Sequence, residues 1–187
     1  VVVSGPETVG VAADKLRTHA WLTDHGFPTV RQTTVADFLA HPETWEFPLI
    51  VKPRWGSAGK GVDRVTSQEA LRLLPDLKTD SIVQEIAPGR EYTVNVLVGR
   101  SGRCLCATPH LRMEVRAGEV SKAVTVKHRG LMELARDIAE ALPEAFGAFN
   151  FQCFLQGDSD LKVIELNARF GGGYPLAREA GADFPRW

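Results

Sequence analysis

The chain has 187 residues, 44% of them hydrophobic and 24% charged, a composition typical of one globular domain or of two small lobes. Its 22 lysines and arginines balance 23 aspartates and glutamates, so no excess charge would attract nucleic acid or an anionic membrane. No apolar run reaches the roughly 20 residues that span a bilayer. We expect neither nucleic acid nor membrane as a partner, and any anion site must be local.

The cysteines and the first residues bear on the cellular setting. Cys104, Cys106 and Cys153 are an odd number without CxxC spacing, which argues against a disulfide framework or a zinc site. Small buried thiols in a reducing, cytoplasmic compartment are the favoured reading. The opening VVVSGPETVG has neither an initiator Met nor a basic segment, so we interpret the chain as a fragment rather than as a sequence with a signal peptide.

In chain order, a short strand and loop are expected over residues 1–10. A helix follows between residues 11 and 27, where apolar residues recur at helical spacing. Lys15 lies in the first turns of this helix beside Asp14, and the pattern fits either a ligand-binding lysine or a solvated surface lysine. A strand and a short helix are predicted over residues 28–40.

The stretch PLIVKPRWGSAGKGVDRV predicts a strand that ends at Lys52, then a glycine-rich loop. Such a loop lets successive backbone N–H groups converge on phosphate oxygens, with a hydroxyl and an ammonium as further donors. The spacing fits neither GxxxxGK followed by Ser or Thr nor GxGxxG before a helix. We predict a hairpin flap over phosphates; a plain flexible hairpin is the alternative. The candidate residues are Gly56, Ser57, Gly59, Lys60 and Gly61.

Strands dominate the next region. After a short helix with Ser67 as its N-cap, a strand bends at Pro88 and Gly89 into a longer, alternating strand. The crossing from Gln84 to Ala87 could line an adenine slot. An antiparallel meander follows, and then an amphipathic helix over residues 131–142.

The segment LKVIELNARFGGG, residues 161–173, begins as a strand. Glu165, Asn167 and Arg169 would share one face at roughly 6.6 Å intervals, a row that suits a metal ion with phosphate oxygens. The preceding strand and a Gly157-Asp158 turn make a hairpin in which Gln152 can face Glu165. A solvated polar face of an edge strand is the alternative.

Five motifs occur in order: Asp14-Lys15, Lys52 before the glycine loop, QEIA with GRE after it, Asn150-Phe151-Gln152, and ELNAR with its glycine tail. Together they resemble the ATP-grasp superfamily, in particular the branch similar to the large subunit of carbamoyl phosphate synthase and to PylC-like ligases. The resemblance implies an α+β fold of one domain, residues 1–187, with nucleotide between a smaller lobe of about 10–83 and a larger antiparallel lobe of about 84–187. It also implies a preceding Rossmann-like domain and a C-terminal part, and we expect both to be missing from this fragment.

The resemblance further implies roles. Lys15 and Lys52 would hold the α- and β-phosphates, the glycine loop would close over the γ-phosphate, and Glu91 would bind the ribose. Arg169 and Lys52 would act on the transferred phosphoryl group. These assignments agree with the need of phosphoryl transfer for positioning and charge neutralisation. The adenine edge would meet Gln84, Glu85, Ile86 and Ala87. One or two magnesium ions, with manganese as a substitute, would be held by Gln152, Glu165 and Asn167.

The implied function is that of an ATP-dependent ligase joining a small-molecule carboxylate to an amine or similar nucleophile through an acyl-phosphate. The chain departs from many relatives in having Gln152 where an acidic residue is common. A nucleotide-binding or regulatory fragment without turnover is the second hypothesis, and a structural domain is the third. Neither the substrates nor the oligomeric state is indicated by the sequence. Two roles are possible for a further set of residues: phosphate or substrate contacts, as in the family, or a solvated face of the meander. The set is His110, Arg112, Lys122, Lys127 and His128.

Overall fold

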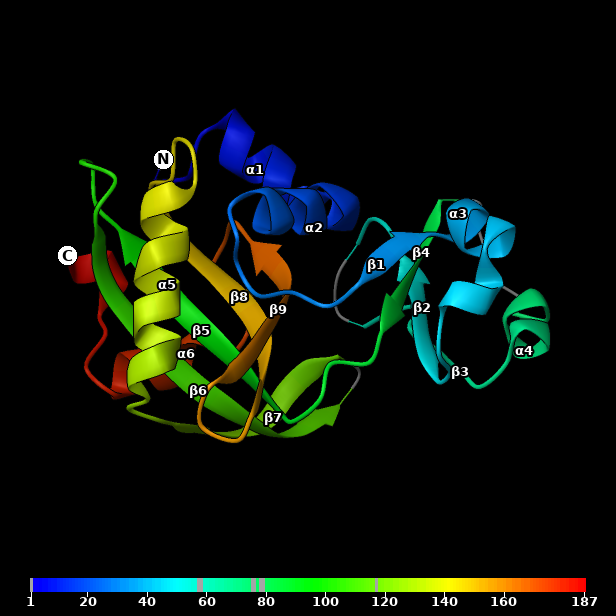
Figure 1. Cartoon of the computed structure of the whole chain (residues 1–187). Coiled ribbons are helices and arrows are strands. Elements are labelled where there is room, and N and C mark those ends of the chain that lie inside the picture. The colour runs from blue at the N-terminus through cyan, green and yellow to red at the C-terminus, as the bar shows by residue number, and fades with distance from the viewer. Residues whose placement is uncertain (1, 57–58, 75–76, 78–79, 117) are drawn as a thin grey trace.

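The computed structural model describes residues 2–56, 59–74, 77, 80–116 and 118–187. They form two lobes, each built on one antiparallel sheet (Figure 1), which confirms the predicted α+β architecture. The smaller sheet has the order β1-β4-β2-β3, and the larger has the order β7-β6-β5-β8-β9.

The smaller lobe packs short helices against one face of its sheet. Phe38, Leu49, Leu71 and Val83 form its core and are almost fully buried. The predicted cap of its last helix is confirmed, because the Ser67 side chain accepts a hydrogen bond from the Ala70 N–H. Its elements are β1 (Gln32–Thr34), α3 (Val35–Ala40), a 3-10 turn (Pro42–Thr44), β2 (Leu49–Pro53), β3 (Asp63–Val65), α4 (Gln68–Arg72) and β4 (Ser81–Glu85).

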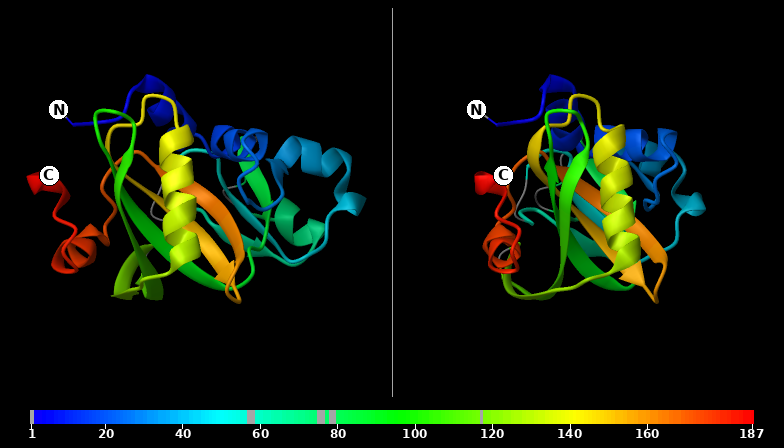
Figure 2. Two further views of the ribbon diagram at one scale, coloured as in Figure 1. Left: turned by 60° about the vertical axis from the view of Figure 1, so that its left-hand side comes forward. Right: turned by 90° about the vertical axis from the view of Figure 1, so that its left-hand side faces the viewer.

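The larger lobe is a sheet covered on both faces. Helix α5 lies along one face, where Leu131 and Ile138 pack on Val94 and Phe151, while α6 packs on the other face against Leu97 (Figure 2). Full burial of one such apolar side chain contributes about 1.5–3 kcal/mol. The strands are β5 (Arg90–Val98), β6 (Cys104–Arg116), β7 (Glu119–Thr125), β8 (Gly147–Gln156) and β9 (Asp160–Asn167), and the later helices are α5 (Arg129–Ala141), α6 (Tyr174–Glu179) and a 3-10 turn (Phe184–Arg186).

The N-terminal region differs from the prediction. No strand forms in residues 2–10; helix α1 (Pro6–Ala13) begins at a proline, whose missing N–H is no loss in a first helical turn. The single helix expected over residues 11–27 is broken at Asp14, and α2 (Lys15–Asp24) starts immediately afterwards.

Helices α1 and α2 pack into the core of the larger lobe and not into that of the smaller lobe, to which the sequence assigned residues from about 10 onward. Val11 and Leu22 join the core of the larger sheet, so the smaller lobe begins near β1 and not near residue 10. The periodicity of a helix shows which face is apolar but not which sheet will cover that face. Among the described residues, no helix has the length and apolarity to cross a membrane.

Candidate functional site

A cavity of about 320 Å³ lies between the two lobes. Ile50 and Ile86 form part of its apolar wall on the smaller lobe, and Phe154 and Ile164 face it from the larger lobe. Most of the predicted ligand-binding residues line it: Lys15, Lys52, Gly56, Gly59, Lys60, Gln84, Glu85, Ile86, Ala87, Glu91, Gln152 and Glu165. Gly61 is not among the lining residues, and Ser57 lies outside the described residues.

Lys52 is a buried cation that lines this cavity. It is the fourth residue of β2, and only 6% of it is exposed. Burial lowers the pKa of Lys52 to about 8; the nearby Glu165 carboxylate opposes that shift and the Lys15 ammonium adds to it. An ammonium in such a place favours an anionic partner.

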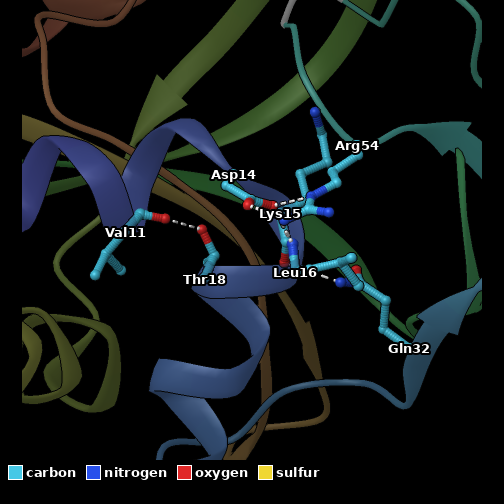
Figure 3. Close-up of polar contacts among 7 residues, drawn as sticks. All are labelled: Val11, Asp14, Lys15, Leu16, Thr18, Gln32 and Arg54. Carbon is cyan, nitrogen blue, oxygen red and sulfur yellow. Dashed lines mark hydrogen bonds and ion pairs between the residues drawn. The ribbon is translucent and has the colours of Figure 1, made fainter. Parts of the chain in front are cut away.

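Lys15 reaches the same cavity from the larger lobe. It is the first residue of α2, and its Nζ donates a hydrogen bond of 2.8 Å to the Gly56 carbonyl. Burial lowers the pKa of Lys15, while Glu165 and Asp14 act in the opposite direction. Figure 3 shows Lys15 between Asp14, Arg54 and Gln32, residues that come from both lobes. The two lysines therefore converge on one cavity although 37 positions separate them in the sequence.

A β-bulge in β9 places the carboxylate. Gln152 pairs with Glu165 as predicted, but the next pair is Cys153 with Val163, so Ile164 is an extra residue. With strict alternation from Val163, Glu165 would point into the core, where an ionised carboxylate is costly. The bulge instead turns both Ile164 and Glu165 toward the cavity, and Leu166 returns to the core.

A second, smaller cavity of about 30 Å³ adjoins the first and shares Gln152 and Glu165 with it. Asn167 and Arg169 line this second cavity, as do the glycines at 171–173. The strand ends at Asn167, so Arg169 lies in the following turn and not on the strand face that was predicted. Its Nη1 donates to the Phe170 carbonyl at 3.0 Å, and the Asn150 side chain donates to the Arg169 carbonyl at 2.8 Å.

Arg112 was left unassigned in the sequence, yet it lines both cavities. Its Nε lies 3.1 Å from a Glu91 oxygen, its side chain is 7% exposed, and Nη2 donates to the Gly118 carbonyl at 3.1 Å. Burial raises the pKa of Glu91, Arg112 opposes this, and Glu165 adds to it. In the β5–β6 pairing Tyr92 lies opposite Leu111, so the next step brings Glu91 opposite Arg112. Counting from the turn in the sequence would not find this pair, because a bulge at Leu97 and Val98 shifts the register.

His110 is the second residue whose environment the sequence did not predict. It is fully buried, its Nδ1 lies 3.3 Å from Asn95 Nδ2, and its Nε2 has no hydrogen-bond partner among the described residues. Burial, with the Arg112 charge, lowers the pKa of His110 to about 4, so the ring is neutral near pH 7. Of the other unassigned residues, Lys122 pairs with Glu114 on the surface, and His128 caps α5 by accepting from Leu131 N–H.

The oxygen atoms around Glu165 suit a hard cation that also coordinates phosphate oxygens of a bound substrate. Within the described ranges, no three His, Cys, Asp or Glu side chains gather as a metal site. In the second cavity, Gln152 and Asn167 offer amide oxygens beside the Glu165 carboxylate, and the Glu119 carboxylate also lines it. Magnesium commonly takes one or two carboxylates plus water and substrate phosphates, so this set fits magnesium when phosphate is present.

The chain is similar to known ligases and carboxylases. The D-alanine–D-alanine ligase of Pseudomonas entomophila is 30% identical over 97% of this chain and 64% of its own length. A Campylobacter jejuni biotin carboxylase, solved as a complex with β-γ-ATP, has a TM-score of 0.77 and 18% identity over 97% of this chain and 46% of that one. The biotin carboxylase domain of Hydrogenobacter thermophilus 2-oxoglutarate carboxylase, solved with MgADP, ADP and bicarbonate, has a TM-score of 0.80 and 14% identity over 99% of this chain and 46% of that one.

These structural likenesses show the fold, and the chain spans from about half to two thirds of the length of the proteins it matches. The ATP-grasp domain profile matches residues 12–173, which contain Lys15, Lys52 and the whole β8–β9 hairpin. The chain therefore belongs to the ATP-grasp domain family.

Proposed function

We propose that this chain is the ATP- and magnesium-binding domain of an ATP-dependent ligase that joins a carboxylate to an amine or similar nucleophile. One observation carries the proposal: a single cavity brings together the half-buried Lys15, the buried Lys52 and the Glu165 carboxylate, which come from both lobes. Such a constellation matches a polyphosphate with its cation. The relationship to D-alanine–D-alanine ligases supports the carboxylate–amine chemistry.

The nucleotide would bind across both lobes. The adenine would lie against Ile50 and Ile164, beside the crossing from Gln84 to Ala87, and Glu91 would accept hydrogen bonds from the ribose hydroxyls. Lys15 and Lys52 would neutralise the phosphates under the glycine loop. Gln152, Glu165 and Asn167 would hold one or two magnesium ions, which supply charge neutralisation on the phosphates when bound.

The second cavity is the proposed place of group transfer. A carboxylate oxygen attacks the γ-phosphorus, the bond to the β–γ bridging oxygen breaks, and ADP leaves. Arg169 would stabilise the transferred phosphoryl group and the acyl-phosphate. The amine then attacks the acyl carbon, the bond from that carbon to the phosphate oxygen breaks, and phosphate leaves as the amine loses a proton. A cytoplasmic setting, where free thiols such as Cys104 persist, completes the proposal.

Gln152 favours a second candidate, a nucleotide-binding module without turnover. An amide at this position removes one negative charge from the predicted metal site, and the chain matches only part of each relative. Both candidates require ATP binding but only the first requires chemistry.

The deciding experiment has two steps. The melting temperature of this chain is measured with ATP, with and without magnesium; ATP at 100 times its Kd should add about 2.7 kcal/mol to the free energy of unfolding. Glu133→Gln, on the exposed face of α5, serves as a matched control that should respond as the parent does. No shift would refute both candidates. ADP release that depends on an added carboxylate would establish the ligase, and its absence across candidate carboxylates would favour the binding module.

A further inference from the structure

Asp14 is a carboxylate buried at the break between α1 and α2. Only 1% of the residue is exposed. One oxygen accepts from the Leu16 N–H at 3.0 Å and from Arg54 Nε at 2.8 Å, and the other accepts from Arg54 Nη2. The fork-to-carboxylate arrangement is the strong, oriented form of an ion pair.

Capping of α2 does not require this charge. In the same chain, Thr34 caps α3 and Ser67 caps α4 with neutral hydroxyls. Asparagine caps a helix about as well as aspartate does. A buried ionised carboxylate is tolerated at low cost only when it is paired. The ion pair with Arg54, and not the capping of α2, therefore accounts for the charge of Asp14.

The pair also crosses between the lobes. Asp14 precedes α2, which packs on the larger sheet, while Arg54 directly follows β2 of the smaller sheet (Figure 3). Around it, every polar group of Lys15 is held from the smaller lobe. The Lys15 N–H donates to the Arg54 carbonyl at 3.3 Å, Gln32 Nε2 donates to the Lys15 carbonyl at 2.9 Å, and Lys15 Nζ donates to the Gly56 carbonyl.

We propose that Asp14 and Arg54 are a positioning pair that fixes the Lys15 ammonium at the phosphate end of the cavity and ties the start of the glycine loop to α2. The inference rests on the proposed function, because Lys15 is taken to meet a phosphate. Asp14 itself does not touch the nucleotide; it acts through Lys15. A phosphate oxygen would share the three ammonium protons with the Gly56 carbonyl, so loop and ligand would be held by one group.

Asp14→Asn tests the pair while keeping the cap. The variant should bind MgATP about tenfold more weakly, as expected when a charge-assisted contact is misplaced and not removed. Adenosine, which has no phosphate, should bind equally to the variant and the parent. In a Lys15→Met background the same change should have no further effect on MgATP, since the group through which it acts is gone. Arg54→Lys, which keeps the charge but loses the fork, should resemble Asp14→Asn.

A readout without nucleotide separates this inference from the proposed function. Backbone amides of residues 59–62 should exchange with solvent faster in Asp14→Asn than in the parent, and Glu133→Gln should change neither exchange nor binding. Equal losses of adenosine and MgATP affinity, or an undiminished effect in the Lys15→Met background, would reduce the pair to a structural role and overturn the inference. If the parent binds no MgATP, the proposed function and the phosphate role of Lys15 both fail. Separately, unchanged hydrogen exchange at residues 59–62 in Asp14→Asn would reject the tie between the loop and α2.

Discussion

Replacing Lys52 by methionine should stabilise the protein while it weakens ATP binding. Burial lowers the pKa of this ammonium from 10.5 to about 8, and at about 1.4 kcal/mol for each pH unit the charged form costs about 3 kcal/mol near neutral pH. Methionine fills a similar volume without a charge, so its free energy of unfolding at pH 7 should be higher by up to about 3 kcal/mol. The lost contact with phosphate should weaken ATP by about 1.5–3 kcal/mol.

The pH dependence has a definite sign. Because the folded pKa lies below the unfolded one, the unfolded chain binds more protons between pH 8 and 10.5, and the parent should gain stability as the pH rises through that window. Urea unfolding at pH 7 and at pH 10 should therefore show the advantage of Lys52→Met shrinking at the higher pH. Lys122→Met, at a lysine whose side chain is 68% exposed, is the control and should show no such trend. A Lys52→Met variant that is less stable at pH 7, or that binds ATP as tightly as the parent, would refute the reasoning.

Three further predictions concern the metal, the loop and the glycine tail. Glu165→Gln should abolish the magnesium dependence of ATP affinity and Gln152→Glu should strengthen it, which a magnesium titration of nucleotide binding would show; coincident curves would place the metal elsewhere. MgATP should slow hydrogen exchange at residues 59–62, and equal exchange with and without nucleotide would contradict closure of the loop. Gly173→Ala should lower the free energy of unfolding by roughly 1–3 kcal/mol in urea titrations, because its Cβ would lie 2.7 Å from His110 Nε2; an unchanged midpoint would mean that the ring moves aside freely.

The sequence predicted those elements whose pattern is local. The apolar stripe of α5 and the β8–β9 hairpin both form where they were expected. Lys52 and Glu165 were expected to meet across two lobes, and they line one cavity. That expectation came from the order of five motifs, since no local pattern relates residues on separate sheets. The chemical roles of these residues stay predictions.

The features that were missed depend on distant partners or on irregular strands. The helical periodicity continues through Asp14, and the group that stabilises the break there is Arg54, forty positions away. The position of Arg112 beside Glu91 follows from a register that a bulge has shifted. Glu165 was predicted at the site, but the bulge at Ile164 that directs it there was not; strict alternation from Val163 would place Glu165 in the core. Ladder irregularities of this kind leave no mark in the hydrophobic pattern.

The bulge at Ile164 separates two contributions of β9 to the cavity wall, one apolar and one charged. Because Val163 and Leu166 both face the core and two residues lie between them, deletion of Ile164 would restore simple alternation with Glu165 still directed at the cavity. Such a shortened strand should keep its hairpin and its carboxylate but lose part of the apolar wall. Within this one strand, Ile164 supplies apolar surface and Glu165 supplies oxygen atoms for a cation. Because Ile164 is an extra residue, either contribution can be lost without the other.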